Sequence, residues 1–178
     1  VQHRASTMDF AAGAVVFPGG RVDDVDRKAT GDAAAHAEAA AAWSQTSITD
    51  GDVLAAMRAA AVRELAEETG AVVDPTRLVP WDNWVTPAAS PKRFDVIFFV
   101  LADEGDTLRN TTTEAVRAGW ESVEEVLRLW EAGDLFLMTP TRVILAEVQR
   151  LATVAAILDH KPVIEPGRRD GGTVRPRR

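Results

Sequence analysis

The stretch RELAEETGA, residues 63–71, combines three glutamates with a glycine near its end and decides how the rest of the chain is interpreted. Good helix formers run back from this stretch to position 50, and Gly70 stands where helices commonly place a glycine after their last turn. We therefore expect one strong helix with Thr49 or Asp50 as its N-cap. Apolar residues recur along this helix at helical spacing and are expected to face the core, namely Val53, Met57, Ala61 and Leu65.

The three glutamates are the first candidates for chemistry. At about 100° of rotation per residue, Glu64, Glu67 and Glu68 fall within an arc of roughly 100° on one helix face. Like charges one turn apart destabilise a helix by roughly 0.2–0.5 kcal/mol, and Mg²⁺, which prefers oxygen ligands, would remove that repulsion. The alternative is a solvated acidic face on which Arg63 pairs with Glu67 one turn further on.

Upstream of the helix, the sequence predicts a buried strand that enters a glycine turn. Residues 11–17 (AAGAVVF) are apolar, and Pro18-Gly19-Gly20 stops the run. Residues 22–49 then separate the turn from the helix as an insertion, within which residues 33–43 predict a short alanine-rich helix. Because long loops in compact domains are usually functional or disordered, we expect the insertion to be a substrate or dimer element rather than part of the core.

The order of these pieces resembles the Nudix hydrolase box. In that family an Arg-Glu-apolar-any-Glu-Glu-any-Gly-apolar string closes a catalytic helix, and residues 63–71 match it at every specified position. Phe17-Pro18-Gly19-Gly20 resembles the strand-to-loop entry of the same box. The resemblance implies an α/β fold, the Nudix α/β/α sandwich with a mixed β-sheet between helices, and a hydrolase that cleaves diphosphate linkages.

The box departs from its usual form in two ways. Ala55 stands at the position of a glutamate that lies eight residues before the arginine, and the insertion separates the glycine pair from the helix. This layout resembles the long-insert Nudix branch that includes the peroxisomal coenzyme A diphosphatases, as do residues 84–87 (WVTP), 91–95 (PKRFD) and Phe98-Phe99. Another acid should therefore partner Arg63, and the candidates are Asp23, Asp24, Asp50 and Asp52.

The resemblance also implies roles for individual residues. Glu67 and Glu68 would be metal ligands, and Glu64 would be a further ligand or the base that acts on the attacking water. Arg63 would orient these carboxylates, and the carbonyl of Gly19 would complete the metal shell. The expected cofactor is Mg²⁺, with Mn²⁺ as the alternative. Three basic side chains are candidates for binding substrate phosphates, with a solvated surface as the equal alternative, namely Arg21, Lys92 and Arg93.

Other residues carry weaker signals. Glu114 opens a late strand, near which some Nudix enzymes place an extra ligand or base, although an ordinary strand-end acid is commoner. The histidines have no partners at metal-ligand spacing and are expected at the surface, namely His3, His36 and His160. Tryptophans beside strands could stack an adenine but are more often core or rim residues, namely Trp81, Trp84, Trp120 and Trp130.

The remaining chain predicts strands and two helices. Residues 94–101 form a continuous apolar run, typical of a strand buried on both faces. Ser122 should cap a helix to Ala132, and Thr139 should cap a long amphipathic helix to Leu158, with proline at its first position. Further strands are predicted over residues 1–4, 72–73, 81–86 and 114–120.

Length and composition limit the remaining possibilities. The 178 residues predict one Nudix domain over 1–161, followed by a mobile Arg/Gly/Pro tail over 162–178. The absence of cysteine excludes disulfides and thiolate metal sites, and the net charge of −7 argues against a nucleic-acid partner. Because no apolar run approaches the roughly 20 residues of a membrane span and no secretory signal is visible, we expect a cytoplasmic protein without membrane contact.

These observations lead to one main functional hypothesis. We expect a Mg²⁺-dependent pyrophosphohydrolase that acts on a nucleoside diphosphate linked to another moiety, with coenzyme A or acyl-CoA as the best substrate guess from the branch resemblance. ADP-ribose, a dinucleotide or a nucleoside triphosphate is the alternative. A nucleotide-binding Nudix module without activity, and a structural protein that binds partners through the insertion, remain open. The expected partner is a small nucleotide-type substrate, with a homodimer as a further possibility.

Overall fold

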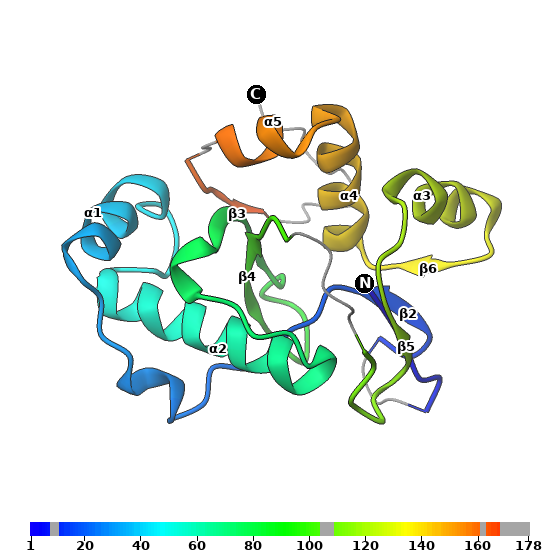
Figure 1. Cartoon of the computed structure of the whole chain (residues 1–178), viewed down its shortest axis with the longest axis horizontal. Coiled ribbons are helices and arrows are strands. Elements are labelled where there is room, and N and C mark those ends of the chain that lie inside the picture. The colour runs from blue at the N-terminus through cyan, green and yellow to red at the C-terminus, as the bar shows by residue number, and fades with distance from the viewer. Residues whose placement is uncertain (8–10, 104–108, 161–162, 168–178) are drawn as a thin grey trace.

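Two small mixed sheets stand between helices in the computed structural model, which describes residues 1–7, 11–103, 109–160 and 163–167 (Figure 1). The first sheet has the order β5-β1-β2-β6, with β2 and β6 parallel and the other pairs antiparallel. The second has the order β4-β3-β7, with β3 antiparallel to β4 and parallel to β7. The strands are β1 (Gln2–Arg4), β2 (Ala14–Val16), β3 (Val79–Val85), β4 (Asp95–Val100), β5 (Ala115–Ala118), β6 (Phe136–Leu137) and β7 (Pro166–Gly167).

The helices are α1 (Ala33–Ala42), α2 (Gly51–Thr69), α3 (Val123–Ala132), α4 (Thr139–Leu151) and α5 (Val154–Asp159), with short 3-10 turns η1 (Asp26–Lys28) and η2 (Pro75–Arg77). This arrangement confirms the predicted α/β class with mixed sheets between helices. Among the described residues, no helix combines the length and the apolar character that crossing a bilayer requires.

Helix α2 has the predicted ends. The Asp50 carboxylate accepts from the backbone amides of Asp52 and Val53, both at 3.0 Å, and Gly70 follows the helix with φ 75°. The predicted core face is only partly buried, because α2 packs against the insertion as well as the strands and its burial is spread around the helix. The buried residues of its apolar part are Leu54, Ala56 and Ala60.

The insertion belongs to the core, so the expectation that it lies outside the core is wrong. Trp43 and Ile48 are fully buried and cluster with Leu54 of α2. The Trp43 ring also meets Phe99 of β4 edge to face, with centroids 5.7 Å apart. The alanine-rich helix α1 therefore packs closely on α2, and Trp43 at its end fills the core between α2 and β4.

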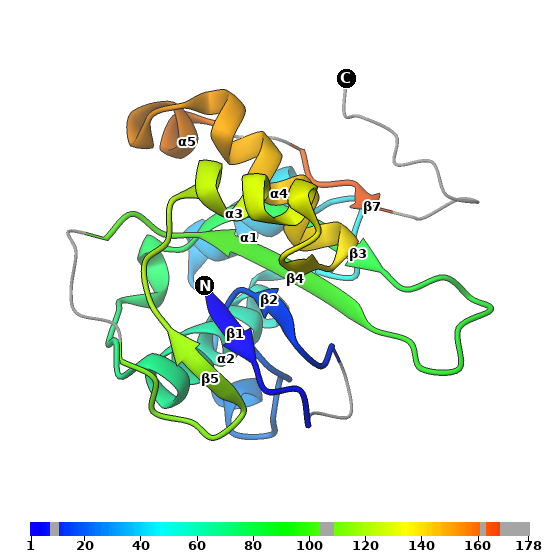
Figure 2. The same ribbon diagram turned by 90° about the vertical axis from the view of Figure 1, so that its right-hand side faces the viewer.

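A second core cluster joins the first sheet to α3 and α4. Figure 2 shows these two helices above β1 and β2. Val15 of β2 packs in this cluster with Val126 of α3 and Leu145 of α4. Ser122 caps α3 as predicted, accepting from the amide of Glu125.

Three predicted elements differ from the structure. Residues 72–73 form no strand, and Val72 is 89% exposed because the chain leaves α2 there without a sheet to join. Strand β4 is an edge strand of a three-stranded sheet, so its first residues are exposed instead of buried on both faces. The long final helix breaks at Ala152, which adopts φ 61°, and Thr153 then caps the separate helix α5.

Part of the segment expected to be a mobile tail packs on the domain. Ile164 is fully buried in the first core cluster, and its amide donates to the carbonyl of Ala42 at 2.7 Å. Pro166 and Gly167 then pair with β3. The rest of that predicted tail, residue 162 and residues 168–178, lies outside the described residues.

Candidate active site

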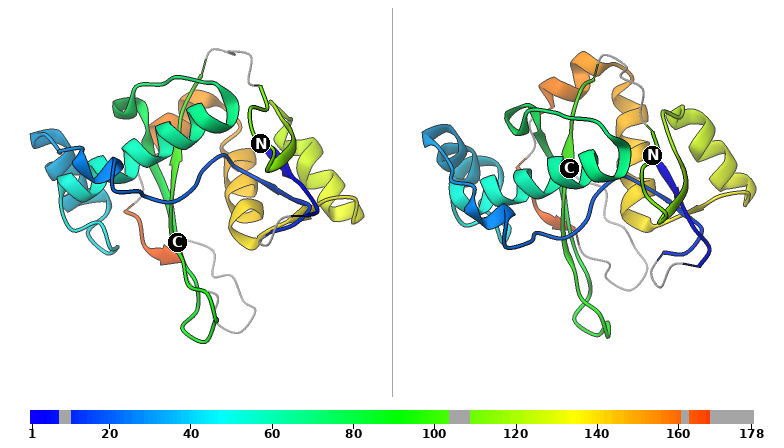
Figure 3. Two further views of the ribbon diagram at one scale, coloured as in Figure 1. Left: turned by 90° about the horizontal axis from the view of Figure 1, so that it is seen from below. Right: turned by 60° about the horizontal axis from the view of Figure 1, so that its bottom comes forward.

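The glycine turn and the end of α2 meet in space although the insertion separates them in sequence. Seen from below in Figure 3, the chain after β2 runs alongside α2 towards the insertion. The amide of Gly19 donates to Oε2 of Glu68 at 2.9 Å. A Cβ atom on Gly20 would overlap the Glu64 carboxylate, so the end of that side chain lies directly against the turn. The turn therefore contacts two of the three glutamates.

Arg63 links the glutamates to the insertion. Its Nη1 donates to Oε1 of Glu64 at 3.0 Å and to Oε2 of Glu67 at 3.1 Å. On its other side, Nε and Nη2 donate to the two carboxylate oxygens of Asp26, at 3.0 and 2.9 Å. Asp26 is 4% exposed, and the Arg63 hydrogen bonds hold the pKa of its carboxyl below the usual range. A buried two-pronged ion pair thus fixes the guanidinium that holds Glu64 and Glu67.

The main partner of Arg63 is Asp26, which is not among the four acids predicted from the sequence. Of those four, Asp23 lies 3.7 Å from Nη2 of Arg63, whereas Asp24, Asp50 and Asp52 form no ion pair with Arg63 among the described contacts. Asp50 caps α2, and Asp52 accepts from the amide of Gly31. The expectation that another acid replaces the missing glutamate is confirmed, but the residue is Asp26.

Ala55 lies inside the continuous helix α2, eight residues and therefore about 12 Å along the axis from Arg63, so a glutamate there would lie far from this site. Counted forward from the glycine turn, Asp26 lies six residues after Gly20, near the start of the insertion. Asp26 is also followed by two basic residues, Arg27 and Lys28, in the turn η1.

The segment after position 108 closes the C-terminal end of α2. The amides of Arg109 and Thr111 donate to the carbonyls of Thr69 and Glu68, at 3.0 and 3.1 Å, and the Thr111 hydroxyl donates to the carbonyl of Glu67. These bonds satisfy carbonyls that a helix end leaves unpaired. They also bring Glu114 towards the glutamates.

Glu68 has the most unusual environment of the three glutamates. Burial raises the pKa of its carboxyl, the Gly19 hydrogen bond opposes that rise, and the negative charges of Glu64 and Glu114 add to it. Glu67, by contrast, has a side chain that is 59% exposed. The site therefore holds one buried acid whose charge is unfavourable without a cation, and one exposed acid that pairs with Arg63.

The donor set suits a hard divalent cation, because carboxylate oxygens are the ligands that Mg²⁺ prefers. Among the described residues, no three acidic or histidine side chains converge on one point. Arg63 holds Glu64 and Glu67 on its own side, while Glu68 points to Gly19. Holding an ion would therefore require at least Glu67 to turn away from Arg63. The structure gives the amide of Gly19, and not its carbonyl, a contact with this cluster.

The candidate phosphate-binding residues lie apart from one another. The carbonyl of Arg21 accepts from Nη2 of Arg63 at 2.9 Å, and the Arg21 side chain is exposed near the glutamates. Lys92 and Arg93 lie on the loop between β3 and β4, which extends away from α2 in Figure 2. Within the described part of the chain, their contacts do not reach the carboxylates: Lys92 lines a surface cavity of about 420 Å³, and Arg93 donates to the carbonyl of Thr86 at 3.4 Å.

The tryptophans and histidines have structural partners. Trp81 is buried against His160, Trp84 donates to Asp82 at 2.8 Å, and Arg142 lies over the ring of Trp130. His3 was expected at the surface, but its side chain is 13% exposed and pairs with Glu121 at 2.6 Å. Trp120 is the exposed member of the set. His36 is exposed and accepts from the amide of Gly51 at 3.0 Å.

Comparisons with known proteins agree with this geometry. Residues 51–139, half of the chain, match the model of the NUDIX domain family, and the chain therefore belongs to the Nudix family. It is 28% identical over 165 residues to the Caenorhabditis elegans protein named "Putative nudix hydrolase 7", covering 85% of this chain and 54% of that protein. The chain thus spans about half the length of this curated relative.

A solved structure supports the fold. The crystal structure of a NUDIX hydrolase from Alicyclobacillus acidocaldarius superposes with a TM-score of 0.70. The superposition covers 91% of this chain and 87% of that one at 21% sequence identity. At this level of identity the likeness concerns the fold alone.

Proposed function

We propose that this chain is a divalent-metal-dependent hydrolase that cleaves the diphosphate linkage of a nucleotide-type molecule. The observation that carries the proposal is the meeting of Glu64 and Glu68 with the glycine turn, with Arg63 holding Glu64 and Glu67. Glutamates gathered on a rigid helix are the groups that such a reaction needs, because the diphosphate is strongly anionic and water is a weak nucleophile.

The three glutamates and Arg63 would have different roles in the reaction. Glu64, Glu67 and Glu68 would hold Mg²⁺, with Mn²⁺ as the alternative, and the bound ion would supply charge neutralisation for the phosphates. Glu64 is also the proposed base: it takes a proton from the attacking water while the water oxygen bonds to one phosphorus and the bridging P–O bond breaks. The products are two phosphorylated molecules. Arg63 is a positioning residue that sets the directions of Glu64 and Glu67.

The proposed substrate rests on the branch resemblance alone. Coenzyme A or an acyl-CoA is the first choice, and ADP-ribose, a dinucleotide or a nucleoside triphosphate is the second. Of the three candidate phosphate contacts, Arg21 lies nearest to the glutamates, since its carbonyl accepts from Arg63, and it is the proposed phosphate contact. Lys92 and Arg93 would serve a more distant part of a long substrate. Mg²⁺ dependence, a cytoplasmic location and a homodimer also stay predictions.

A substrate panel tests the proposal. Coenzyme A, acetyl-CoA, ADP-ribose, NADH and ATP are incubated with the full chain, with and without Mg²⁺, and phosphorylated products are separated by chromatography. We expect Mg²⁺-dependent cleavage of at least one diphosphate, and its loss in the Glu67→Gln variant. Binding of a nucleotide without any product would instead assign a non-catalytic module. If the chain neither binds nor cleaves any compound of the panel, the proposal is wrong.

A further inference from the structure

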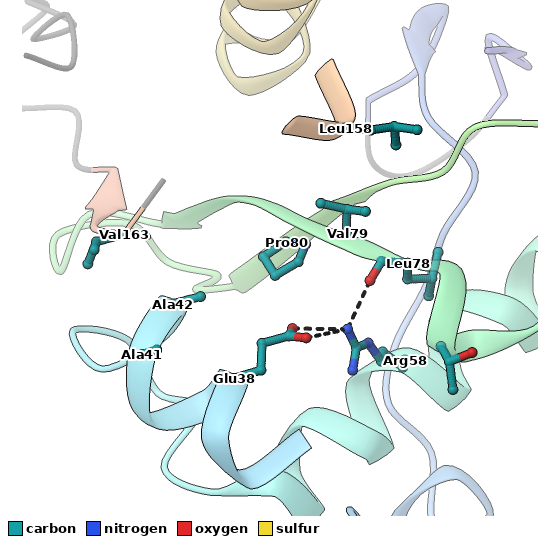
Figure 4. A pocket seen from close by; sticks show the side chains of 10 residues that line it. Glu38, Ala41, Ala42, Arg58, Leu78, Val79, Pro80, Leu158 and Val163 are labelled. Carbon is teal, nitrogen blue, oxygen red and sulfur yellow. Dashed lines mark hydrogen bonds and ion pairs between the residues drawn. The ribbon is translucent and has the colours of Figure 1, made fainter. Parts of the chain in front are cut away.

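A cavity of about 460 Å³ lies between the insertion helix α1, helix α2 and the start of β3 (Figure 4). This volume falls within the range of about 300–1,000 Å³ that is typical of small-molecule sites. None of the three glutamates of α2 lines it, so it is separate from the candidate active site. The cavity has no role in the function proposed above.

The walls of the cavity are aliphatic. Ala41 and Ala42 come from α1, Val79 and Pro80 from β3, and Leu158 from α5. Figure 4 shows these side chains around one space, and no aromatic ring is among the described residues that line it. Burying an aliphatic group against such walls is favourable at about 25 cal/mol per Å² of apolar surface removed from water.

The polar lining consists of the Arg58–Glu38 ion pair and Thr76, whose hydroxyl donates to Asp74 at 2.7 Å. Nη2 of Arg58 donates to the two carboxylate oxygens of Glu38, at 2.9 and 2.8 Å, and to the carbonyl of Leu78 at 2.9 Å (Figure 4). Oε1 of Glu38 also accepts from the Trp43 indole at 3.4 Å, whereas Oε2 accepts from Arg58 alone among the residues that the structure describes. Because a carboxylate oxygen has two lone pairs, Oε2 keeps the capacity to accept one more hydrogen bond.

The charges of this polar lining bear on which ligands fit. The opposite charges of Glu38 and Arg58 offset each other, so this lining favours neither an anion nor a cation by net charge. A neutral N–H donor matches the acceptor that Glu38 keeps. We propose that the cavity binds a short aliphatic molecule that carries a neutral N–H donor, as a primary amide does. Its chain packs on the aliphatic walls, and its N–H donates to Glu38.

Three probes of nearly equal size test the ligand chemistry. Hexanamide is neutral and carries the donor, methyl hexanoate is neutral without a donor, and hexanoate is the anion. Each is titrated into the full-length protein while the methyl NMR signals of Ala42, Val79 and Leu158 are followed. A hydrogen bond to a charged group contributes about 1.5–3 kcal/mol, so hexanamide should bind about tenfold more tightly than either other probe.

A matched pair of variants tests whether the ligand binds in this cavity. Ala42→Phe fills the cavity and should abolish hexanamide binding, whereas Ala40→Phe adds the same ring to an exposed position of the same helix and should leave binding unchanged. If Ala42→Phe does not fold, the methyl shifts of the wild-type protein decide. Absent shifts at these methyls, equal binding by both variants, or hexanoate binding as tightly as hexanamide would overturn the proposal. Because this test measures binding and not turnover, its result does not depend on the proposed hydrolase activity.

Discussion

Asp26 and Arg63, 37 residues apart in the chain, form a two-pronged ion pair with contacts of 3.0 and 2.9 Å. Asp26 belongs to the insertion, and Arg63 belongs to the helix that carries the glutamates. Because the remaining nitrogen of Arg63 holds Glu64 and Glu67, the insertion controls the direction of two proposed metal ligands through one guanidinium. Several consequences of this pair can be measured.

Replacing Asp26 with Asn should reduce turnover and Mg²⁺ affinity by about 10- to 100-fold, the usual effect of losing a group that orients metal ligands. The asparagine keeps the shape but removes the charge that fixes Arg63, while the substrate KM should change little because Asp26 lies behind the arginine. Mg²⁺ binding is measured directly by calorimetry, and turnover is measured on the substrate that the panel identifies.

Asp24→Asn is the matched control, because Asp24 is an exposed acid of the same segment and forms no ion pair with Arg63 among the described contacts. Its turnover and Mg²⁺ affinity should equal those of the wild type. Asp26→Glu, which keeps the charge on a longer side chain, should restore part of both. Equal losses in Asp24→Asn and Asp26→Asn would show that net charge, and not the contact with Arg63, is responsible.

The same pair predicts a pH dependence of stability. Because Arg63 lowers the pKa of Asp26 in the folded state, the pair contributes stability above the unfolded value of about 3.9, and this contribution is lost as the pH falls through the lower folded pKa. The difference in unfolding free energy between the wild type and Asp26→Asn should therefore be constant near neutral pH and shrink below about pH 4. Urea titrations without metal measure it; a difference that grows towards low pH would contradict the assignment.

Glu67→Gln and Glu68→Gln should separate activity from folding. The Glu67 side chain is largely exposed, so its amide variant should unfold at nearly the same urea concentration as the wild type. Glu68 is buried with an unfavourable charge, so its neutral variant should be at least as stable without metal. Both should lose turnover by orders of magnitude. Wild-type rates for both at saturating Mg²⁺ would remove these residues from the metal site.

Gly20→Ala should disturb the site without disturbing the fold. A methyl group there would overlap the Glu64 carboxylate, which is the mobile end of a side chain and can move away. We expect a folded protein in which Glu64 is displaced and turnover falls. Gly119→Ala is the control, because a Cβ at position 119 meets no atom within 4 Å. Equal rates for the two variants would show that the position of Glu64 does not matter.

The local patterns of the sequence predicted the elements well, and the failures involve contacts between distant segments. Asp50, Gly70 and Ser122 end or begin helices through bonds within a few residues, so their roles could be inferred from spacing. The partner of Arg63 depends on how a long insertion folds back on α2, which no local periodicity reports. Asp26 could be reached only by counting from the glycine turn.

The wrong predictions of burial also arise from contacts between distant segments. The run from Val96 to Val100 is apolar, yet whether its strand is central or at an edge depends on how many strands join the sheet. The insertion is rich in alanine and weakly amphipathic, so its composition did not indicate that Trp43 and Ile48 complete a core cluster. Burial of these residues is a property of the assembled layers.

This role of the insertion leads to a prediction about stability. Trp43 is fully buried between α1, α2 and β4, so Trp43→Ala should lower the unfolding free energy by about 3–5 kcal/mol, the usual cost of deleting a large core side chain. Trp120→Ala removes the same side chain from a position that is 61% exposed and should cost about 1 kcal/mol or less. Urea unfolding followed by circular dichroism measures both.

Replacing residues 27–49 with a short Gly-Ser bridge should accordingly give an unfolded or strongly destabilised chain, because the first core cluster loses Trp43 and Ile48 together. A bridged protein as stable as the wild type would show that the insertion is dispensable for the core.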